Sequence, residues 1–150
     1  MQILMIVGSE MGNAEMVGDL VKDELESNGH EVEVFDDGGL VDVGFEDHEV
    51  VLVVTSTTGL GDVPQNIEPL YDEMVEERPD LEHVRYGLVG LGDHNYKETF
   101  CGGPKKWLQI LDELGATRVG EALMLDATDN PAPDEDAIEW LPGWLGHFES

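Results

Sequence analysis

Hydrophobic residues along the chain fall into two alternating patterns. One is a short continuous run, present at residues 2–7 and 50–55, which is typical of strands buried on both faces of a parallel sheet. Over residues 30–35 a strand is indicated by alternation instead, with Val32 and Val34 on one side. The predicted strands cover residues 2–7, 30–35, 50–55, 84–91 and 119–125.

The second pattern repeats apolar residues at steps of three and four, which predicts amphipathic helices. Four helices are predicted, from Asn13 to the stop at Asn28-Gly29, from Pro64 through Val75, from Gly102 to Leu114, and over residues 134–148. Pro142 should kink or shorten the last of them. The apolar faces of the first, second and last helices comprise Met16, Val17, Leu20, Val21 and Leu25; Ile67, Leu70, Tyr71, Met74 and Val75; and Ile138, Trp140, Leu141, Trp144, Leu145 and Phe148.

Strands that alternate with helices predict a parallel sheet joined by right-handed crossovers. With five strands, helices on both faces and no linker or internal repeat, residues 1–150 are expected to form one α/β domain around a small doubly wound sheet. Ligands of such sheets bind beyond the carboxyl ends of the strands, where the strand order reverses. The loops that follow the predicted strands are therefore the first candidates for function.

The chain is strongly acidic, and its charge argues against several classes of partner. Its 150 residues include 34 Asp and Glu against 7 Lys and Arg, for a net charge of −27. Nucleic acids and anionic membrane surfaces require clustered cations, so neither is an expected partner. Residues 1–77 carry 20 acids and one base, Lys22. This acidic half either docks a basic partner at a salt-dependent rate or forms a solvated surface suited to solubility or high salt.

Nothing in the sequence indicates export, a membrane span or a metal site. No apolar run approaches the roughly 20 residues that a bilayer requires, and the N-terminus lacks a basic region followed by a cleavage site. Cys101 is the single cysteine, so an internal disulfide is impossible. No set of His, Cys and Asp has the spacing of metal ligands. A reducing, cytoplasmic location is the expectation.

The loop after the first predicted strand, Gly8–Ala14, has the composition of a phosphate site. Between a strand and a helix, backbone N–H groups and the helix dipole can receive an anion. Ser9 adds a hydroxyl donor, Gly12 permits close approach, and Asn13 can cap the helix. Because G-x-x-x-x-G-K-[ST] and G-x-G-x-x-G are both absent, P-loop and dinucleotide-binding classes are disfavoured. An ordinary strand-to-helix turn would also favour Ser, Gly and Asn.

Two later loops carry further candidate chemistry. Residues 55–66, after the third strand, open with four consecutive hydroxyl residues and contain Gly59 and Gly61, which allow backbone conformations closed to other residues. Residues 90–102, after the fourth strand, present Tyr96 on a loop flanked by glycines. A tyrosine in that setting can stack on a flat ring, although an exposed tyrosine alone is usually only part of the surface.

Together, and in this order, the three loops resemble the flavin mononucleotide (FMN) loops of the flavodoxin family. The second and third read T-x-T-x-G-x-G-D-x-P-x-N and G-L-G-D-x-x-Y-x-x-x-F-C, similar to short-chain flavodoxins and the FMN domains of diflavin reductases. The resemblance covers essentially the whole chain and is closest to the MioC-type flavodoxins, through R-P-D-L at 78–81, T-F-C-G at 99–102 and E-W-L at 139–141. It implies a flavodoxin-like sheet of order 2-1-3-4-5.

The resemblance also implies roles for individual residues. Ser9 through Ala14 would hold the FMN phosphate, and Tyr96 would stack on one face of the isoalloxazine ring. At Gly59 the following peptide would turn so that its carbonyl accepts a hydrogen bond from N5–H of the reduced flavin. Thr58 stands where many flavodoxins carry a second stacking aromatic residue. The implied FMN-binding residues are Ser9, Glu10, Met11, Gly12, Asn13, Ala14, Thr55, Ser56, Thr57, Thr58, Gly59, Leu60, Gly61, Gly92, Asp93, Asn95, Tyr96, Phe100 and Cys101.

The implied function is that of a monomeric, low-potential one-electron carrier without catalytic residues. It would receive electrons from an NADPH-linked flavin reductase, such as a ferredoxin/flavodoxin-NADP reductase, and pass them to a reductive acceptor enzyme. The MioC-type resemblance suggests biotin synthase as that acceptor. Negative charge near the ring would disfavour the anionic reduced flavin and so lower its potential. An FMN-dependent quinone reductase and a flavin-free interaction protein are the alternatives.

Overall fold

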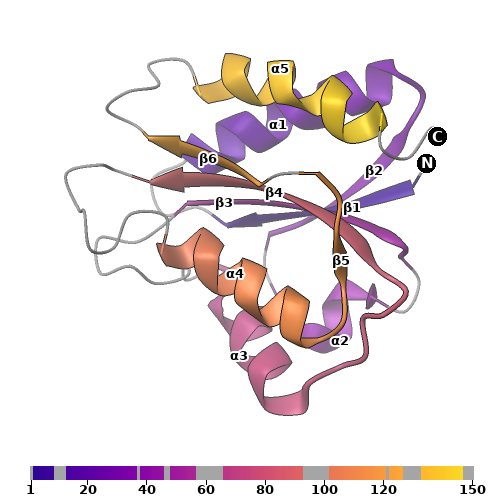
Figure 1. Ribbon diagram of the computed structural model, residues 1–150, viewed down its shortest axis with the longest axis vertical. Coiled ribbons are helices and arrows are strands. Elements are labelled where there is room, and N and C mark those ends of the chain that lie inside the picture. Colours follow the sequence, from indigo (N-terminus) through magenta and orange to yellow (C-terminus); the bar gives the residue numbers. More distant parts are fainter. Residues whose placement is uncertain are drawn as a thin grey trace.

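The computed structural model describes residues 2–8, 13–36, 38–45, 48–56, 66–92, 102–120, 122–126 and 133–146 (Figure 1). The strands are β1 (Gln2–Gly8), β2 (Glu31–Phe35), β3 (Val50–Ser56), β4 (Arg85–Gly92), β5 (Thr117–Arg118) and β6 (Leu123–Asp126). The helices are α1 (Asn13–Ser27), α2 (Leu40–Val43), α3 (Glu68–Glu77), α4 (Gly102–Glu113) and α5 (Pro133–Gly146). The α/β class predicted from the hydrophobic pattern is confirmed.

All pairs in the sheet are parallel, and the strand order is β2-β1-β3-β4-β5, with β6 also paired to β4. The predicted order 2-1-3-4-5 is therefore confirmed. The fifth position is shared by two short strands, because β5 pairs with residues 85–86 and β6 with residues 89–92. The prediction of one unbroken strand over residues 119–125 is wrong. Gly120 has a φ of 71°, and a positive φ interrupts an extended strand.

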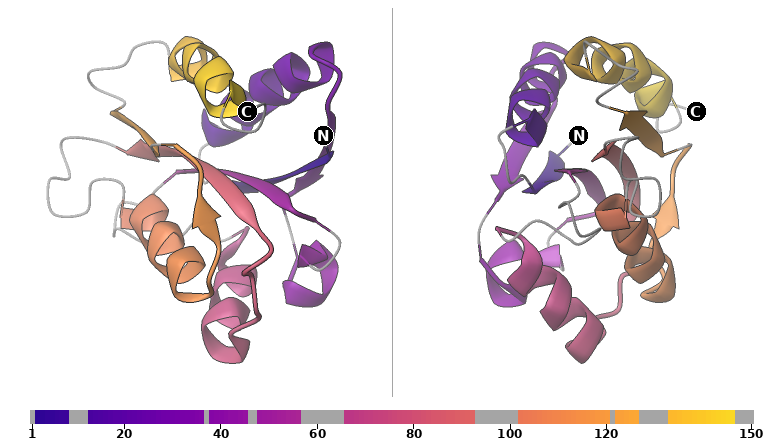
Figure 2. Two further views of the ribbon diagram at one scale, coloured as in Figure 1. Left: turned by 45° about the vertical axis from the view of Figure 1, so that its right-hand side comes forward. Right: turned by 90° about the vertical axis from the view of Figure 1, so that its left-hand side faces the viewer.

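The sheet separates two helical layers. Helices α1 and α5 cover one face, and α2, α3 and α4 cover the other (Figures 1 and 2). The interior strand β1 is buried on both faces: Leu4 and Ile6 join one hydrophobic cluster, whereas Ile3, Met5 and Val7 join the other. This double burial explains why β1 is a continuous apolar run rather than an alternating one.

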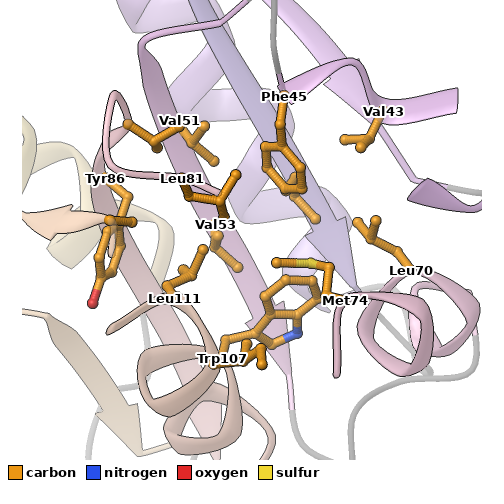
Figure 3. Packing of buried hydrophobic residues seen from close by; sticks show 14 of the residues in the cluster. Val43, Phe45, Val51, Val53, Leu70, Met74, Leu81, Tyr86, Trp107 and Leu111 are labelled. Carbon is orange, nitrogen blue, oxygen red and sulfur yellow. The ribbon is translucent and has the colours of Figure 1, made fainter. Parts of the chain in front are cut away.

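The core beneath α3 and α4 is built around a large aromatic side chain. Figure 3 shows Trp107 of α4 beside Met74 of α3 and Val53 of β3. Trp107 is fully buried, and its ring meets that of Tyr71 edge-on at a centroid distance of 5.7 Å. The indole therefore packs α3 and α4 against each other as well as against the sheet.

The buried helical faces are narrower than the apolar repeats predict. In α1, Val17, Val21 and Leu25 are fully buried, and because residues four apart share one line along a helix, this single line covers the sheet. Three residues of the predicted apolar helix faces are instead exposed, namely Met16, Leu20 and Val75. For these three the prediction of a buried face is wrong, and Phe148 lies outside the described residues. Val34 of β2 is also exposed.

The structure places prolines in both α3 and α5. Helix α3 begins at Glu68 rather than at Pro64, which lies outside the described residues, and Pro69 occupies its first turn. Proline fits there because its missing N–H would have no acceptor within the helix. Helix α5 continues through Pro142 to Gly146. Among the described residues, no helix combines the length and apolar character needed to cross a membrane.

Helix α5 packs on the sheet over a glycine. A Cβ atom at Gly87 of β4 would lie 2.4 Å from Nε1 and 2.6 Å from Cε2 of Trp144. The Trp144 side chain is only 2% exposed and stacks on Trp140 at a centroid distance of 5.7 Å. The absence of a side chain at Gly87 thus makes room for the indole that holds α5 on the sheet.

We expect Gly87→Ala to lower the free energy of unfolding by about 1–3 kcal/mol, because the added methyl group overpacks the contact with Trp144. Urea denaturation measures this change. Gly143→Ala is the matched control: no atom lies within 4 Å of its added Cβ, and alanine within a helix stabilises by roughly 0.5–1 kcal/mol. Equal stability of Gly87→Ala and wild type would contradict the packing described for α5.

Helix α4 is linked to the sheet by a partly buried hydrogen bond. The hydroxyl of Tyr86 in β4 donates to Oδ1 of Asp112 in α4 at 2.9 Å, and Tyr86 is fully buried. Burial, reinforced by the neighbouring carboxylate, raises the pKa of Tyr86 well above its ordinary value. The folded protein therefore strongly favours the neutral tyrosine.

This pKa shift predicts a loss of stability in alkali. The unfolded chain releases the Tyr86 proton near the ordinary tyrosine pKa of about 10, whereas the folded chain retains it. The stabilisation is complete below about pH 10 and is lost as the pH rises further. We expect Tyr86→Phe to show a shallower decline in unfolding free energy between about pH 9 and 11 than wild type, measured by urea denaturation. Identical slopes would contradict the assignment.

Candidate functional site

The strands that precede the three candidate loops end side by side. Gly8 of β1 pairs with Thr55 of β3, and Thr55 pairs with Gly90 of β4, so one row of residues crosses the three strands near their carboxyl ends. Neighbouring strands lie about 4.8 Å apart, which places Gly8 and Gly90 roughly 10 Å from each other. The sheet register therefore brings to one edge the strand ends from which three loops, distant in the sequence, depart.

This edge includes the point at which the strand order reverses. Strand β2 lies on one side of β1, and β3 lies on the other. Helix α1 follows β1 and covers one face of the sheet, whereas α3 follows β3 and covers the opposite face (Figure 1). In open α/β sheets the ligand crevice lies where two such connections diverge, which in this topology is between the ends of β1 and β3.

Two helices also begin at this edge. Helix α1 starts at Asn13, shortly after β1 ends at Gly8, and α4 starts at Gly102, after the loop that follows β4. The first N–H groups of a helix have no partners within it, and they coincide with the positive end of the helix dipole. The start of α1 therefore suits a phosphate group, as the composition of residues 8–14 predicts.

Close packing fixes the end of β1. A Cβ atom at Gly8 would lie 2.3 Å from Cδ1 of Ile67 and 2.8 Å from Oγ1 of Thr55. Ile67 and Thr55 are both fully buried. Glycine is thus the residue that lets β3 and the segment before α3 close around the start of the first loop.

Asn66 makes two polar connections at this edge. Its side-chain amide donates one hydrogen bond to the carbonyl oxygen of Val7 and another to that of Asp36, both at 2.8 Å. These acceptors lie at the end of β1 and just after β2. The sequence interpretation did not place Asn66 among the site residues, although Asn66 is the last position of the T-x-T-x-G-x-G-D-x-P-x-N motif.

The structure describes only some of the implied FMN-binding residues. Thr55 is buried within the sheet beside Gly8. Asn13, Ala14, Ser56 and Gly92 lie at the adjoining ends of α1, β3 and β4. The others fall outside the described residues, namely Ser9, Glu10, Met11, Gly12, Thr57, Thr58, Gly59, Leu60, Gly61, Asp93, Asn95, Tyr96, Phe100 and Cys101.

An acidic groove of about 260 Å³ lies next to the crevice, between α1 and β2. It is lined by Met5, Val7, Glu15, Gly18, Asp19, Val34 and Asp36. All of its ionisable lining residues are acids, so this side of the edge has a negative potential. Nowhere in the described ranges do three His, Cys, Asp or Glu side chains form a group that could hold a metal ion.

Comparison with known proteins agrees with this geometry. The family model described as flavodoxin matches residues 5–140 of the chain. Flavodoxin YqcA of Escherichia coli (strain K12) is 39% identical over 144 residues, which make up 95% of each chain. The chain belongs to the flavodoxin family. Protein MioC of the same strain is 37% identical over 143 residues, again 95% of each chain.

A solved flavodoxin supports the assignment over the full length. The structure entitled "C101A mutant of Flavodoxin from Pseudomonas aeruginosa" superposes with a TM-score of 0.91 and 33% identity, and the superposition covers 100% of both chains. The resemblance to flavodoxins, including the MioC type, is therefore confirmed.

Flavodoxins are electron-transfer proteins, and membership of the family supports the role of an FMN-binding electron carrier for this chain. Its described residues fit such a cofactor. The start of α1 suits the phosphate, and the crevice between β1 and β3 is the position at which flavodoxin-like sheets bind FMN.

Proposed function

We propose that this flavodoxin is a low-potential one-electron carrier between an NADPH-linked flavin reductase and a reductive acceptor enzyme. The observation that carries the proposal is the convergence of three loop-bearing strand ends at the strand-order switch, with Gly8, Thr55 and Gly90 in one row. When bound there, FMN supplies the one-electron chemistry, while the protein supplies binding and electrostatics. The similarity to MioC makes biotin synthase the first acceptor to examine.

The proposed cofactor contacts follow the order of the loops. Residues 9–14 hold the phosphate with backbone N–H groups and hydroxyls at the start of α1. Tyr96, on the loop after β4, stacks on one face of the ring, because offset or edge-on aromatic contacts are favourable. Gly59, on the loop after β3, offers a backbone carbonyl to the ring, and glycine permits the peptide at that position to turn at little cost.

The charge of the protein supports both parts of this function. With a net charge of −27, and with Glu15, Asp19 and Asp36 around the groove beside the crevice, the protein disfavours further negative charge on a bound group. This effect lowers the reduction potential. The same field attracts a reductase or an acceptor that presents a basic face, at a rate that falls as salt screens it.

The proposal predicts the behaviour of the FMN-loaded protein under anaerobic conditions. NADPH alone should leave its visible flavin spectrum unchanged, because a carrier in this role receives its electrons through the reductase. Addition of a catalytic amount of ferredoxin/flavodoxin-NADP reductase should bleach the flavin band, and the initial rate should fall between low and high salt. Free FMN at the same concentration is the control.

Two outcomes would contradict the proposal. Oxidation of NADPH by the purified protein in the presence of a quinone, without the reductase, would favour an FMN-dependent quinone reductase. Failure of the purified protein to bind FMN in an absorbance titration would favour an interaction protein without flavin.

A further inference from the structure

We propose that Asn66 is a positioning residue of the FMN site, which holds the returning end of the β3 loop against the ends of β1 and β2. The inference rests on the proposed function and extends it to the last residue of the second loop, which is not among the implied FMN-binding residues. Its basis is the pair of 2.8 Å hydrogen bonds from the Asn66 amide to the carbonyl oxygens of Val7 and Asp36.

These two bonds join segments that are far apart in the sequence. Val7 lies 59 residues from Asn66, and Asp36 lies 30 residues from it. An amide nitrogen carries two N–H donors, so a single Asn side chain can serve both carbonyls at once. Alanine at this position would supply neither donor, and a carboxylate would place an acceptor against two acceptors.

The connection matters because of where the loop after β3 begins and ends. The loop departs from Ser56, on the β3 side of β1. It returns at Asn66, whose side chain reaches the β2 side of β1 through Asp36. The loop therefore leaves from β3, and its returning end is bonded both to the end of β1 and to the segment after β2.

The residue after Asn66 reinforces the same attachment. Ile67 is fully buried, and its Cδ1 would lie 2.3 Å from a Cβ atom added at Gly8, where the first loop starts. Ile67 thus fixes the backbone by apolar packing, while Asn66 fixes it by directed hydrogen bonds. Together the two residues attach the end of the loop after β3 to the end of β1, where the loop proposed to bind the phosphate starts.

Loss of the Asn66 donors should raise the cost of binding FMN. A loop end without its attachment samples more conformations, and the entropy lost on ordering it is then subtracted from the binding free energy. The relative position of the two loops should also change, which alters the protein groups presented to the ring. Both the affinity and the reduction potentials of the bound cofactor are therefore expected to respond.

The test compares Asn66→Ala and Asn66→Leu with Asn28→Ala. Leucine approximates the shape of asparagine without its donors or a charge. Asn28 is a matched control because its amide also donates to a backbone carbonyl, that of Glu24, at 2.8 Å. It lies after the last residue of α1, Ser27, whereas the crevice lies near the start of that helix.

Three quantities are measured for each variant: the Kd of the apo-protein for FMN, the two one-electron midpoint potentials, and the urea midpoint of the apo-protein. We expect both Asn66 variants to raise the Kd about tenfold, equivalent to about 1.4 kcal/mol, and to shift at least one potential. Asn28→Ala should leave the Kd and both potentials unchanged.

Wild-type Kd and potentials in folded Asn66 variants, even with a lowered urea midpoint, would overturn the inference and leave Asn66 a purely structural residue. That result would not affect the proposed function. Absence of FMN binding by the wild-type protein itself would overturn the proposed function and this inference together, so the two failures are distinguishable.

Discussion

The structure depends on the burial of β1 between two parallel neighbours and two helical layers. Its backbone pairs with β2 on one side and with β3 on the other. Its side chains alternate between the two hydrophobic clusters, with Leu4 and Ile6 in one and Ile3 and Met5 in the other. This arrangement suits the apolar run Ile3–Val7, because both faces of the strand are withdrawn from water and both of its edges are hydrogen-bonded.

The position of the functional edge follows from this constraint. Since β2 and β3 occupy opposite sides of β1, the helices that follow β1 and β3 cover opposite faces, and the crevice opens at the carboxyl end of β1. Gly8 ends the strand under close packing with Ile67. The Asn66 amide then joins the end of β1 to the segment after β2. The candidate loop ends are thereby attached to a strand that is buried on both faces.

Much of this architecture could be predicted from the sequence, because long apolar runs and helical repeats report burial directly. The repeats do not report which apolar residues obtain a tertiary partner. Met16 and Leu20 therefore fit the repeat of α1 and are nevertheless exposed. The division of the fifth strand depends on a single positive φ angle at Gly120, which no periodicity records.

The candidate site was less predictable than the fold. Each loop, taken alone, also fits an ordinary turn, and only their order and combined motifs indicate flavodoxin. The role inferred for Asn66 could not be predicted, because its acceptors are 59 and 30 residues distant in the chain and become neighbours only through the strand order. The sequence shows only that Asn66 is the last position of a motif, whereas the structure shows which carbonyl groups accept its hydrogen bonds.

FMN is proposed to bind at the carboxyl edge of the sheet, and amide chemical shifts test this placement most directly. In the ¹⁵N-labelled apo-protein, addition of FMN should shift or broaden the amide signals of Gly8, Ser56 and Gly92. The amides of Glu31 and Arg85, at the opposite ends of their strands, should stay in place. Shifts confined to the Glu31 and Arg85 end, or none at saturating FMN, would contradict the account.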